Sequence, residues 1–326
     1  MASSPDASPA GPGRQDRPPR QDQMSGQDRQ RYGCWTAGSL LGQGALGRVF
    51  LAHDGTGRAA ALRVVHASLA RDQGFRTRFA REVHAIGAVR GRHIAALLDA
   101  DPHGATPWLA TEYVPGPTLA ARVRDMGGPL GTAELRALAS ALAGALDDVH
   151  RAGLVHGGLR PSNVLLAAEG PRVVDFGTGA CAGYAGHAGH AGYVEYRGGR
   201  GYTAPELLAE DAVTKPPADV FALGAVLAFA ATGRAPFAAG GEGGGTDDDG
   251  PALTDVPREL LPLITACLAG HPTARPAPRT VARMAGLPLP GSRRRALTLA
   301  GTLFLAQLPA VAGPLGGRWR SRTGER

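Results

Sequence analysis

Three glycines near the N-terminus have the spacing of a loop that binds phosphate groups. Gly42, Gly44 and Gly47 form a G-x-G-x-x-G pattern, and Val49 follows it. Because glycine has no side chain, the backbone N–H groups of such a loop can approach a triphosphate closely. Dinucleotide-binding folds share the pattern, but in them a helix follows the last glycine. Here residues 48–52 read as a strand, which indicates a hairpin that covers the phosphates.

Further motifs follow in a fixed order along the chain. They are PWLATEYV at 107–114, RPSNVLL at 160–166, DFG at 175–177, APE at 204–206, DVFALG at 219–224 and CLAGHPTARP at 267–276. Each motif alone could arise by chance, whereas the ordered set is specific. The set resembles the bacterial eukaryotic-like serine/threonine protein kinases, and the resemblance covers about residues 31–286.

The resemblance implies a site for ATP and magnesium, which a protein kinase positions while it neutralises the charge of the transferred phosphoryl group. The residues that match the nucleotide-binding positions of the family are Leu41, Gly42, Gly44, Gly47, Val49, Ala61, Arg63, Glu112, Val114 and Leu165. Asn163 and Asp175 match the magnesium ligands. Glu82 matches the glutamate that pairs with the basic residue of the third strand, and Arg275 matches the arginine that pairs with Glu206.

The phosphate-binding lysine of the family is replaced in this chain. The family pattern V-A-I-K reads A-A-L-R at 60–63, so that Arg63 stands in the place of the lysine. The charge persists, but the planar guanidinium is bulkier than an ammonium group and aims its donors differently. Arg63 could therefore pair bidentately with Glu82 and stop short of the phosphates. Lys215, the only lysine of the chain, lies in the second lobe and cannot substitute for it.

The catalytic aspartate of the family is also replaced. The pattern H-R-D-x-x-x-x-N reads H-G-G-L-R-P-S-N at 156–163, so that Gly158 stands where the aspartate accepts the proton of the substrate hydroxyl. Positioned acid–base help is worth about 10²–10⁴-fold in rate. The nearest upstream acids, Asp147 and Asp148, belong to the preceding helix and are poor stand-ins.

Three smaller departures affect the same chemistry. Gly157 replaces the arginine that receives a phosphorylated activation loop in the family. No serine or threonine lies between Thr178 and Thr203, so the usual phosphate acceptor of that loop is missing too. Gly199 stands where the family has a threonine that contacts the catalytic aspartate.

These departures predict a pseudokinase: a kinase-like signalling protein that binds ATP, transfers phosphate poorly or not at all, and acts as a scaffold or allosteric partner. Two alternatives stay open. One is a low-activity serine/threonine kinase that transfers the ATP γ-phosphate to protein Ser or Thr through positioning and metal alone. The other is an interaction scaffold that binds no nucleotide. The sequence does not identify the protein partner or substrate.

The elements that must position these residues fall into two groups. Short strands surround one helix in the first group, with strands expected at 49–51, 61–65 and 108–114 and the helix at 75–89. Helical patterns dominate the second group, at 133–151, 219–232 and 259–268, with a strand pair at 164–166 and 172–174. The expected fold class is therefore α+β, a two-lobed protein kinase fold. Its small β-rich N-lobe spans about residues 31–114, and its larger, mostly helical C-lobe spans about 118–286.

The formal charge of +7 lies mainly outside this domain. Residues 287–326 contain seven Arg and one Glu, while residues 1–30 contain four Arg and four Asp. The domain at 31–286 is therefore nearly neutral. Because nucleic-acid binders normally carry their basic patch on the folded domain, we do not expect a nucleic-acid partner.

The two ends of the chain have contrasting compositions. Residues 1–30 contain almost no large apolar side chains, so we expect them to be disordered. The segment 296–317 is apolar, has arginines on both sides, and is long enough to cross a bilayer. It is read either as a transmembrane anchor in the tail 287–326 or as an amphipathic or collapsed tail.

The cysteine content favours a cytoplasmic setting for the domain. Cys34, Cys181 and Cys267 are odd in number and widely spaced, which fits neither a disulfide framework nor a metal site. The N-terminus has no apolar run of the kind found in secretory signals.

Overall fold

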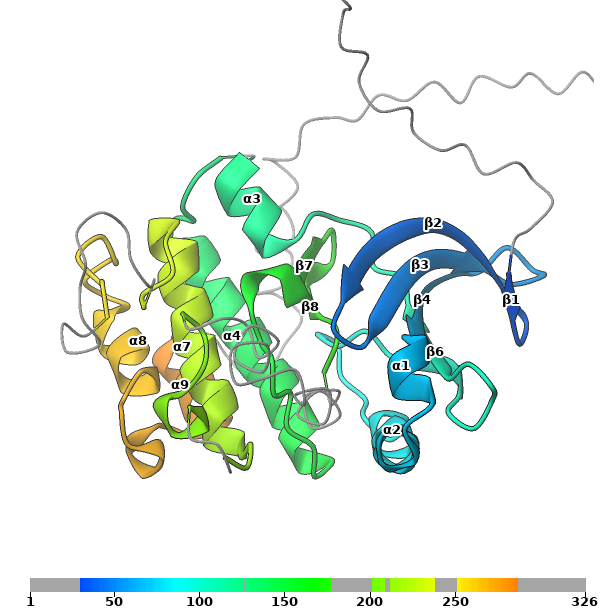
Figure 1. The fold of residues 1–326 in the computed structure, drawn as a ribbon. Helices are drawn as coiled ribbons and strands as arrows, with labels where there is room; N and C mark the ends of the chain where they lie inside the picture. The colour runs from blue at the N-terminus through cyan, green and yellow to red at the C-terminus, as the bar shows by residue number, and fades with distance from the viewer. Residues whose placement is uncertain (1–29, 126, 177–200, 209–211, 238–250, 287–326) are drawn as a thin grey trace, which may run out of the picture.

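The computed structural model describes residues 30–125, 127–176, 201–208, 212–237 and 251–286. A curled sheet with one long helix forms a smaller lobe, and a group of helices forms a larger one (Figure 1). This arrangement confirms the expected α+β, two-lobed fold. The first described strand begins at Arg31 and the last described helix ends at Met284. The expectations for residues 1–29 and 287–326 lie outside the described residues and stay predictions.

The sheet of the smaller lobe is antiparallel, with six strands in the order β1-β2-β3-β4-β6-β5. They are β1 (Arg31–Tyr32), β2 (Trp35–Gly44), β3 (Gly47–His53), β4 (Ala59–Val65), β5 (Leu97–Asp101) and β6 (Trp108–Glu112). The strands expected at 49–51, 61–65 and 108–114 correspond to β3, β4 and β6. The sequence patterns do not predict β2 and β5, because β2 contains irregular pairing and all five residues of β5 are half-buried without alternation.

The long helix of this lobe, α2 (Gln73–Ile86), follows the short helix α1 (Ala67–Ala70) and packs under the sheet (Figure 1). Asp72 caps α2, since its side chain accepts a hydrogen bond of 2.8 Å from the backbone N–H of Phe75. The buried residues of α2 recur at helical spacing, as one apolar face requires. They are Phe75, Phe79, Val83 and Ile86. This face fixes the helix against the sheet and thereby places Glu82.

The larger lobe contains most of the helices. They are α3 (Leu119–Asp125), α4 (Thr132–Arg151), α7 (Pro216–Thr232), α8 (Leu261–Cys267) and α9 (Pro278–Met284), with the short 3-10 turns η1 (Pro161–Asn163), η3 (Pro205–Leu207) and η4 (Pro272–Ala274). Two strands, β7 (Val164–Ala167) and β8 (Gly170–Val173), form a hairpin beside α4. The predicted strand pair and the helical patterns at 133–151 and 219–232 are confirmed, whereas α8 is shorter than the pattern at 259–268.

Helix α7 is the centre of this lobe, because its residues from Ala218 to Ala231 are all buried. It contacts both α4 and α8. Gly224 allows the close approach of α8, since a Cβ atom at Gly224 would lie 2.7 Å from the Cβ of Cys267. A helix that is buried all round must satisfy any charge that it carries, which bears on Asp219 at its first turn.

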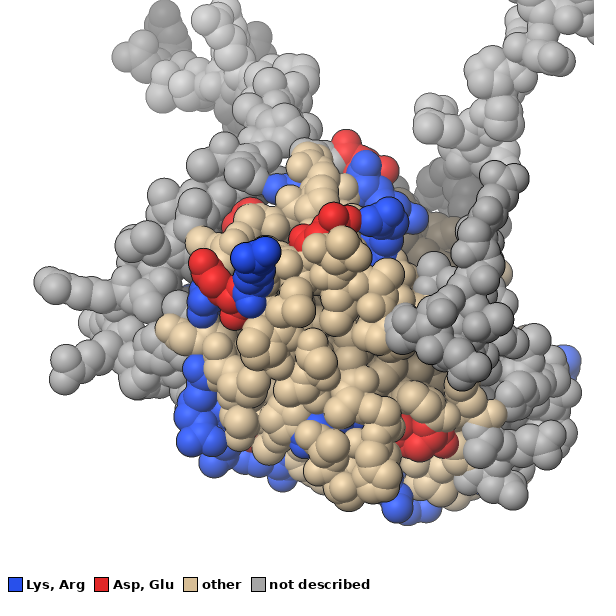
Figure 2. Space-filling model, turned by 90° about the vertical axis from the view of Figure 1, so that its left-hand side faces the viewer, with Lys and Arg blue, Asp and Glu red and all other residues tan. Residues whose placement is uncertain are grey.

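The far end of the larger lobe faces the viewer in Figure 2. Acidic and basic side chains there lie around a centre that is largely uncharged. Across the described ranges, no helix has both the length and the apolar character needed to cross a membrane. The segment 296–317, for which membrane crossing is predicted, lies outside those ranges.

The ion pair between Glu206 and Arg275, expected from the resemblance, is confirmed and is bidentate. Nη1 of Arg275 lies 2.6 Å from one carboxylate oxygen of Glu206, and Nη2 lies 2.8 Å from the other. The same guanidinium donates to the carbonyl groups of Ala269, Pro217 and Gly270. All five N–H donors of Arg275 are therefore used, and its side chain is fully buried.

Replacing Arg275 with alanine should reduce the free energy of unfolding by about 3 kcal/mol, because it leaves a partly buried carboxylate and three carbonyl groups without their donor. Urea denaturation would measure the change. Arg234→Ala is the matched control, since the pair of Arg234 with Asp255 is 70% and 58% exposed. Its loss should cost less than about 1 kcal/mol. Equal losses in the two variants would contradict the anchoring role of Arg275.

Candidate functional site

The glycine-rich pattern forms the predicted hairpin. Strands β2 and β3 pair antiparallel, and Gly44 lies opposite Gly47 at the turn. Gly47 is required by packing, because a Cβ atom there would lie 1.9 Å from the carbonyl oxygen of Val64. By contrast, a Cβ atom at Gly42 or Gly44 would meet no atom within 4 Å. The fold itself does not demand glycine at these two positions, and the open space beside them suits a ligand that approaches the backbone.

The expected walls of the nucleotide site lie on one face of the sheet. Val49 lies opposite Arg63 in the β3–β4 register, and Leu51 lies opposite Ala61. Because side chains alternate along a strand, Val49, Ala61 and Arg63 point to the same side. The intervening residue Leu62 points to the other face of the sheet, where it packs into an apolar cluster of buried side chains.

The segment that leads from the smaller lobe to the larger one follows β6. The backbone N–H of Glu112 donates to the carbonyl of Ala96 at 2.8 Å, and the carboxylate of Glu112 pairs with Arg172 on β8. Val114 is buried, and Leu165 on β7 is half-buried. Glu112, where the segment begins, is thereby tied to both lobes, which holds the predicted adenine-contacting backbone in place.

Arg63, which stands in the lysine position, reaches across to the metal-ligand position. Its Nη2 atom forms an ion pair with Oδ1 of Asp175, and its side chain is 9% exposed. Asp175 has a φ of 61°, in the left-handed region that few non-glycine residues adopt. The proposed pairing of Arg63 with Glu82 stays a prediction.

The environment of Asp175 keeps its carboxyl group ionised. Burial, the largest single influence, would raise the pKa of Asp175, but it is opposed above all by the charge and the hydrogen bond of Arg63. Smaller contributions from His156 and Arg160 act in the same direction as Arg63, so that the pKa lies below its usual value. Arg63 is therefore the principal counter-charge of Asp175.

Asn163, the second predicted metal ligand, is buried and holds the neighbouring loop. Its side-chain nitrogen donates to the carbonyl of Gly158 at 2.9 Å. The backbone carbonyl of Asn163 accepts a hydrogen bond of 3.0 Å from the backbone N–H of Val174. Asn163 therefore links the segment around Gly158 to the residue that precedes Asp175.

Arg63 occupies part of the site in which Asp175 and Asn163 would hold a magnesium ion. Magnesium takes near-octahedral oxygen coordination, usually from one or two carboxylates with water and phosphate oxygens. Here one carboxylate oxygen of Asp175 pairs with the guanidinium of Arg63, for which a magnesium ion would have to compete, whereas Asn163 donates to Gly158 through its amide nitrogen, which is not a magnesium ligand. In the part of the chain that the structure describes, no three His, Cys, Asp or Glu side chains gather as a metal site.

Asp219 on α7 anchors the loop that carries Gly158. Its carboxylate accepts from the backbone N–H groups of His156 and Gly157 at 2.8 and 2.9 Å, and it lies 2.8 Å from Nε2 of His150. Sequence analysis placed Asp219 in a motif but missed this role. The sequence did contain an indication of this role. An aspartate in the first turn of a strongly apolar helix is expected to be buried, and a buried carboxylate needs hydrogen-bond donors around it.

The anchored loop also explains the glycine at position 157. Gly157 has a φ of 71°, which glycine adopts without steric cost. The arginine that the family carries here would have to accept that strain. Gly158, in contrast, is not among the residues with positive φ.

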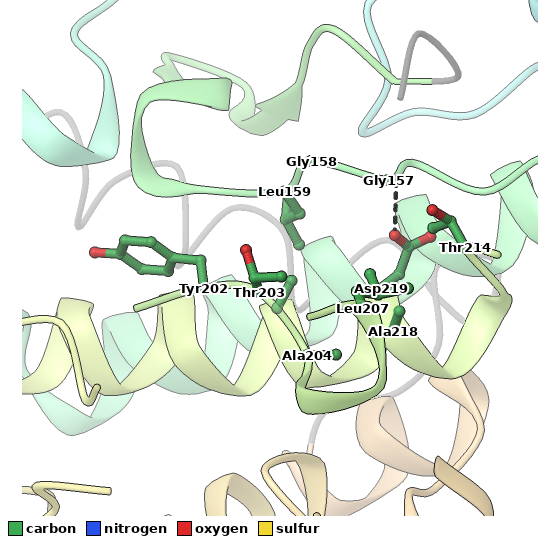
Figure 3. Close-up of a pocket in the computed structure, with 11 residues that line it drawn as sticks. Gly157, Gly158, Leu159, Tyr202, Thr203, Ala204, Leu207, Thr214, Ala218 and Asp219 are labelled. Carbon is green, nitrogen blue, oxygen red and sulfur yellow. Dashed lines mark hydrogen bonds between the residues drawn. The ribbon is translucent and has the colours of Figure 1, made fainter. Parts of the chain in front are cut away.

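A cavity of about 10 Å³, roughly one water molecule in size, lies beside Gly158 (Figure 3). Its lining residues are Gly157, Gly158, Leu159, Tyr202, Thr203, Ala204, Leu207, Thr214, Ala218, Asp219 and Ala222. Asp219 supplies the single carboxylate of this lining, and it points to the amide of Gly157 (Figure 3). Gly199, the other substituted residue expected here, lies outside the described residues.

The upstream acids are engaged elsewhere. Asp147 accepts from Arg279 at 3.0 Å and from Arg151 at 3.1 Å, and Asp148 pairs with Arg151 as well. Both lie on α4, outside the lining of the cavity at Gly158. They are therefore poor stand-ins for the missing aspartate, as predicted.

Comparison with known proteins agrees with this geometry. The family model "Protein kinase domain" matches residues 35–285. The serine/threonine-protein kinase AfsK of Streptomyces coelicolor is 41% identical over 264 residues, which cover 79% of this chain and 32% of that protein. The probable serine/threonine-protein kinase PkwA of Thermomonospora curvata is 41% identical over 252 residues, which cover 76% of this chain and 33% of that protein.

Among solved structures, the Mycobacterium tuberculosis PknI kinase domain is 26% identical with a TM-score of 0.63, and the match covers 81% of this chain and 99% of that one. The chain spans about a third of the length of the curated relatives AfsK and PkwA. The expected relationship to bacterial serine/threonine kinases is confirmed, and the chain belongs to the protein kinase family.

Proposed function

We propose that this kinase domain is a pseudokinase that binds ATP and acts in signalling through a protein partner. The observation that carries the proposal is the lack of a base at Gly158. The carboxylate that lines the adjacent cavity, Asp219, already accepts two backbone N–H groups and contacts His150. It cannot accept the proton of a substrate hydroxyl without releasing the loop that it holds.

The size of the expected defect follows from the role of the missing group. Ordinary kinases turn over at about 1–100 s⁻¹. Loss of a positioned base lowers the reaction rate by about 10²–10⁴-fold. Phosphate transfer at about 1 s⁻¹ or below is therefore expected from positioning alone.

The capacity to bind ATP is supported by features that the fold does not otherwise need. Gly42 and Gly44 face open space, although no packing constraint excludes a side chain there. Val49 and Ala61 share one face of the sheet and offer an apolar surface to an adenine ring. The backbone that would meet the adenine edge is fixed at Glu112 by its bond to Ala96.

The role as a signalling platform is supported by what the domain retains. The bidentate pair of Glu206 with Arg275 and the hydrogen bonds of Asp219 hold the larger lobe in a defined shape. Neither interaction needs a catalytic base. A domain with its structural ion pairs in place but without its base suits recognition by a protein partner better than catalysis.

A labelled-phosphate transfer assay tests the catalytic part of the proposal. The double variant Gly158→Asp with Arg63→Lys should raise any turnover by at least about 100-fold, because it supplies a base and a compact phosphate-binding cation. Because Gly158 does not have a positive φ, aspartate is accommodated without backbone strain. Gly158→Ala with Arg63→Lys is the matched control and should stay inactive. Turnover of the unmodified chain at about 10–100 s⁻¹, in the upper part of the range of ordinary kinases, would contradict the proposal.

A thermal-shift titration with ATP tests the binding part. ATP at about 100 times its Kd should stabilise the domain by about 2.7 kcal/mol. Gly44→Val should weaken this effect by at least about tenfold in affinity, since a side chain there would occupy the approach to the phosphates. Gly55→Val is the matched control, because Gly55 also faces open space but lies in the β3–β4 turn. Equal effects of the two substitutions would argue against a phosphate site at the hairpin.

A further inference from the structure

Arg63 has the position and the charge to replace a metal ion. It lies on the sheet face that Val49 and Ala61 share, and its Nη2 atom contacts Oδ1 of Asp175. Asp175 matches the residue that binds magnesium in the family. The contact therefore joins a permanent cation of this chain to the carboxylate that would otherwise hold a divalent cation.

The guanidinium and a metal ion compete for the same carboxylate. Arginine remains protonated at every physiological pH, so the ion pair is not broken by deprotonation of Arg63. Magnesium also sheds its bound water reluctantly and needs close, near-octahedral oxygen ligands. To bind at Oδ1 of Asp175 it would have to displace the guanidinium of Arg63, whose side chain is 9% exposed.

The charges around the expected phosphate position also favour Arg63 over a metal ion as the counter-charge of Asp175. A kinase site repels the phosphates of ATP through its metal-ligand and catalytic aspartates, and magnesium offsets that repulsion. Here Arg63 compensates Asp175, and Gly158 contributes no charge at all. Arg160 adds a second positive charge near Asp175, and its buried Nε atom has no hydrogen-bond partner among the described residues.

We propose that the domain binds ATP without a divalent cation, and that Arg63 supplies the positive charge that magnesium supplies in an ordinary kinase. This inference rests on the proposed ATP-binding function and specifies its ionic requirement. The ligand is a free nucleoside triphosphate rather than its magnesium complex. Arg63 is then the residue that determines this specificity.

Calorimetric titration of the 326-residue chain with ATP, in EDTA and in excess magnesium, tests the inference. Binding should occur in EDTA, and magnesium should change the Kd by less than about threefold. Binding that is at least about tenfold tighter with magnesium would overturn the inference and leave the proposed ATP binding intact. Absence of binding in both buffers would overturn the proposed ATP binding and the inference with it.

Two variants examine the role of Arg63 and Asp175 with the same binding readout. Arg63→Lys should make binding depend on magnesium by at least about tenfold, because an ammonium group releases the carboxylate more readily. Asp175→Asn should bind ATP in EDTA at least as tightly as the unmodified chain, since it removes a negative charge. Melting of each variant without ligand verifies that it is folded. Magnesium independence in Arg63→Lys, or loss of binding in EDTA in Asp175→Asn, would overturn the assignment of Arg63.

Discussion

The carboxylate of Asp219 is the contact on which the geometry of the site depends. A charge inside an apolar helix is costly unless donors surround it, and the cost is several kcal/mol for an unpaired ion. The donors are the backbone N–H groups of His156 and Gly157 together with the His150 ring. Because two of these donors belong to the backbone, the requirement fixes the course of the chain whatever side chains follow.

A series of contacts connects this anchor at Asp219 to the rest of the site. Asn163 holds the carbonyl of Gly158 and accepts from the backbone of Val174. Val174 precedes Asp175, whose carboxylate meets Arg63 of the smaller lobe. One sequence of contacts thus runs from the core of the larger lobe to the sheet of the smaller one. Loss of the side chain at position 158 does not interrupt it, because every link at Gly158 uses backbone atoms.

The sequence predicted the parts of this fold that depend on local pattern or on a complete motif. The glycine hairpin, the buried helix at 219–232 and the pair of Glu206 with Arg275 were all expected and observed. The sequence did not predict the partner of Arg63 at Asp175. These residues are 112 positions apart, and the sequence suggested only Glu82 as the partner of Arg63. The partner depends on how the two lobes meet, which no local pattern records. The structure supplies the contact with Asp175, and the pairing with Glu82 stays a prediction.

The two departures from the family, at positions 63 and 158, act on one quantity, the charge near the nucleotide phosphates. An aspartate at 158 would add a negative charge near the ATP phosphates, and a metal ion would offset the resulting repulsion. A metal ion would need Asp175, which Arg63 neutralises. Under the proposed metal-free binding, a base at 158 and a guanidinium paired to Asp175 are mutually unfavourable, since the base calls for a cation with which the guanidinium competes. Loss of the base removes this conflict, which gives a physical reason for both substitutions to occur in the same chain.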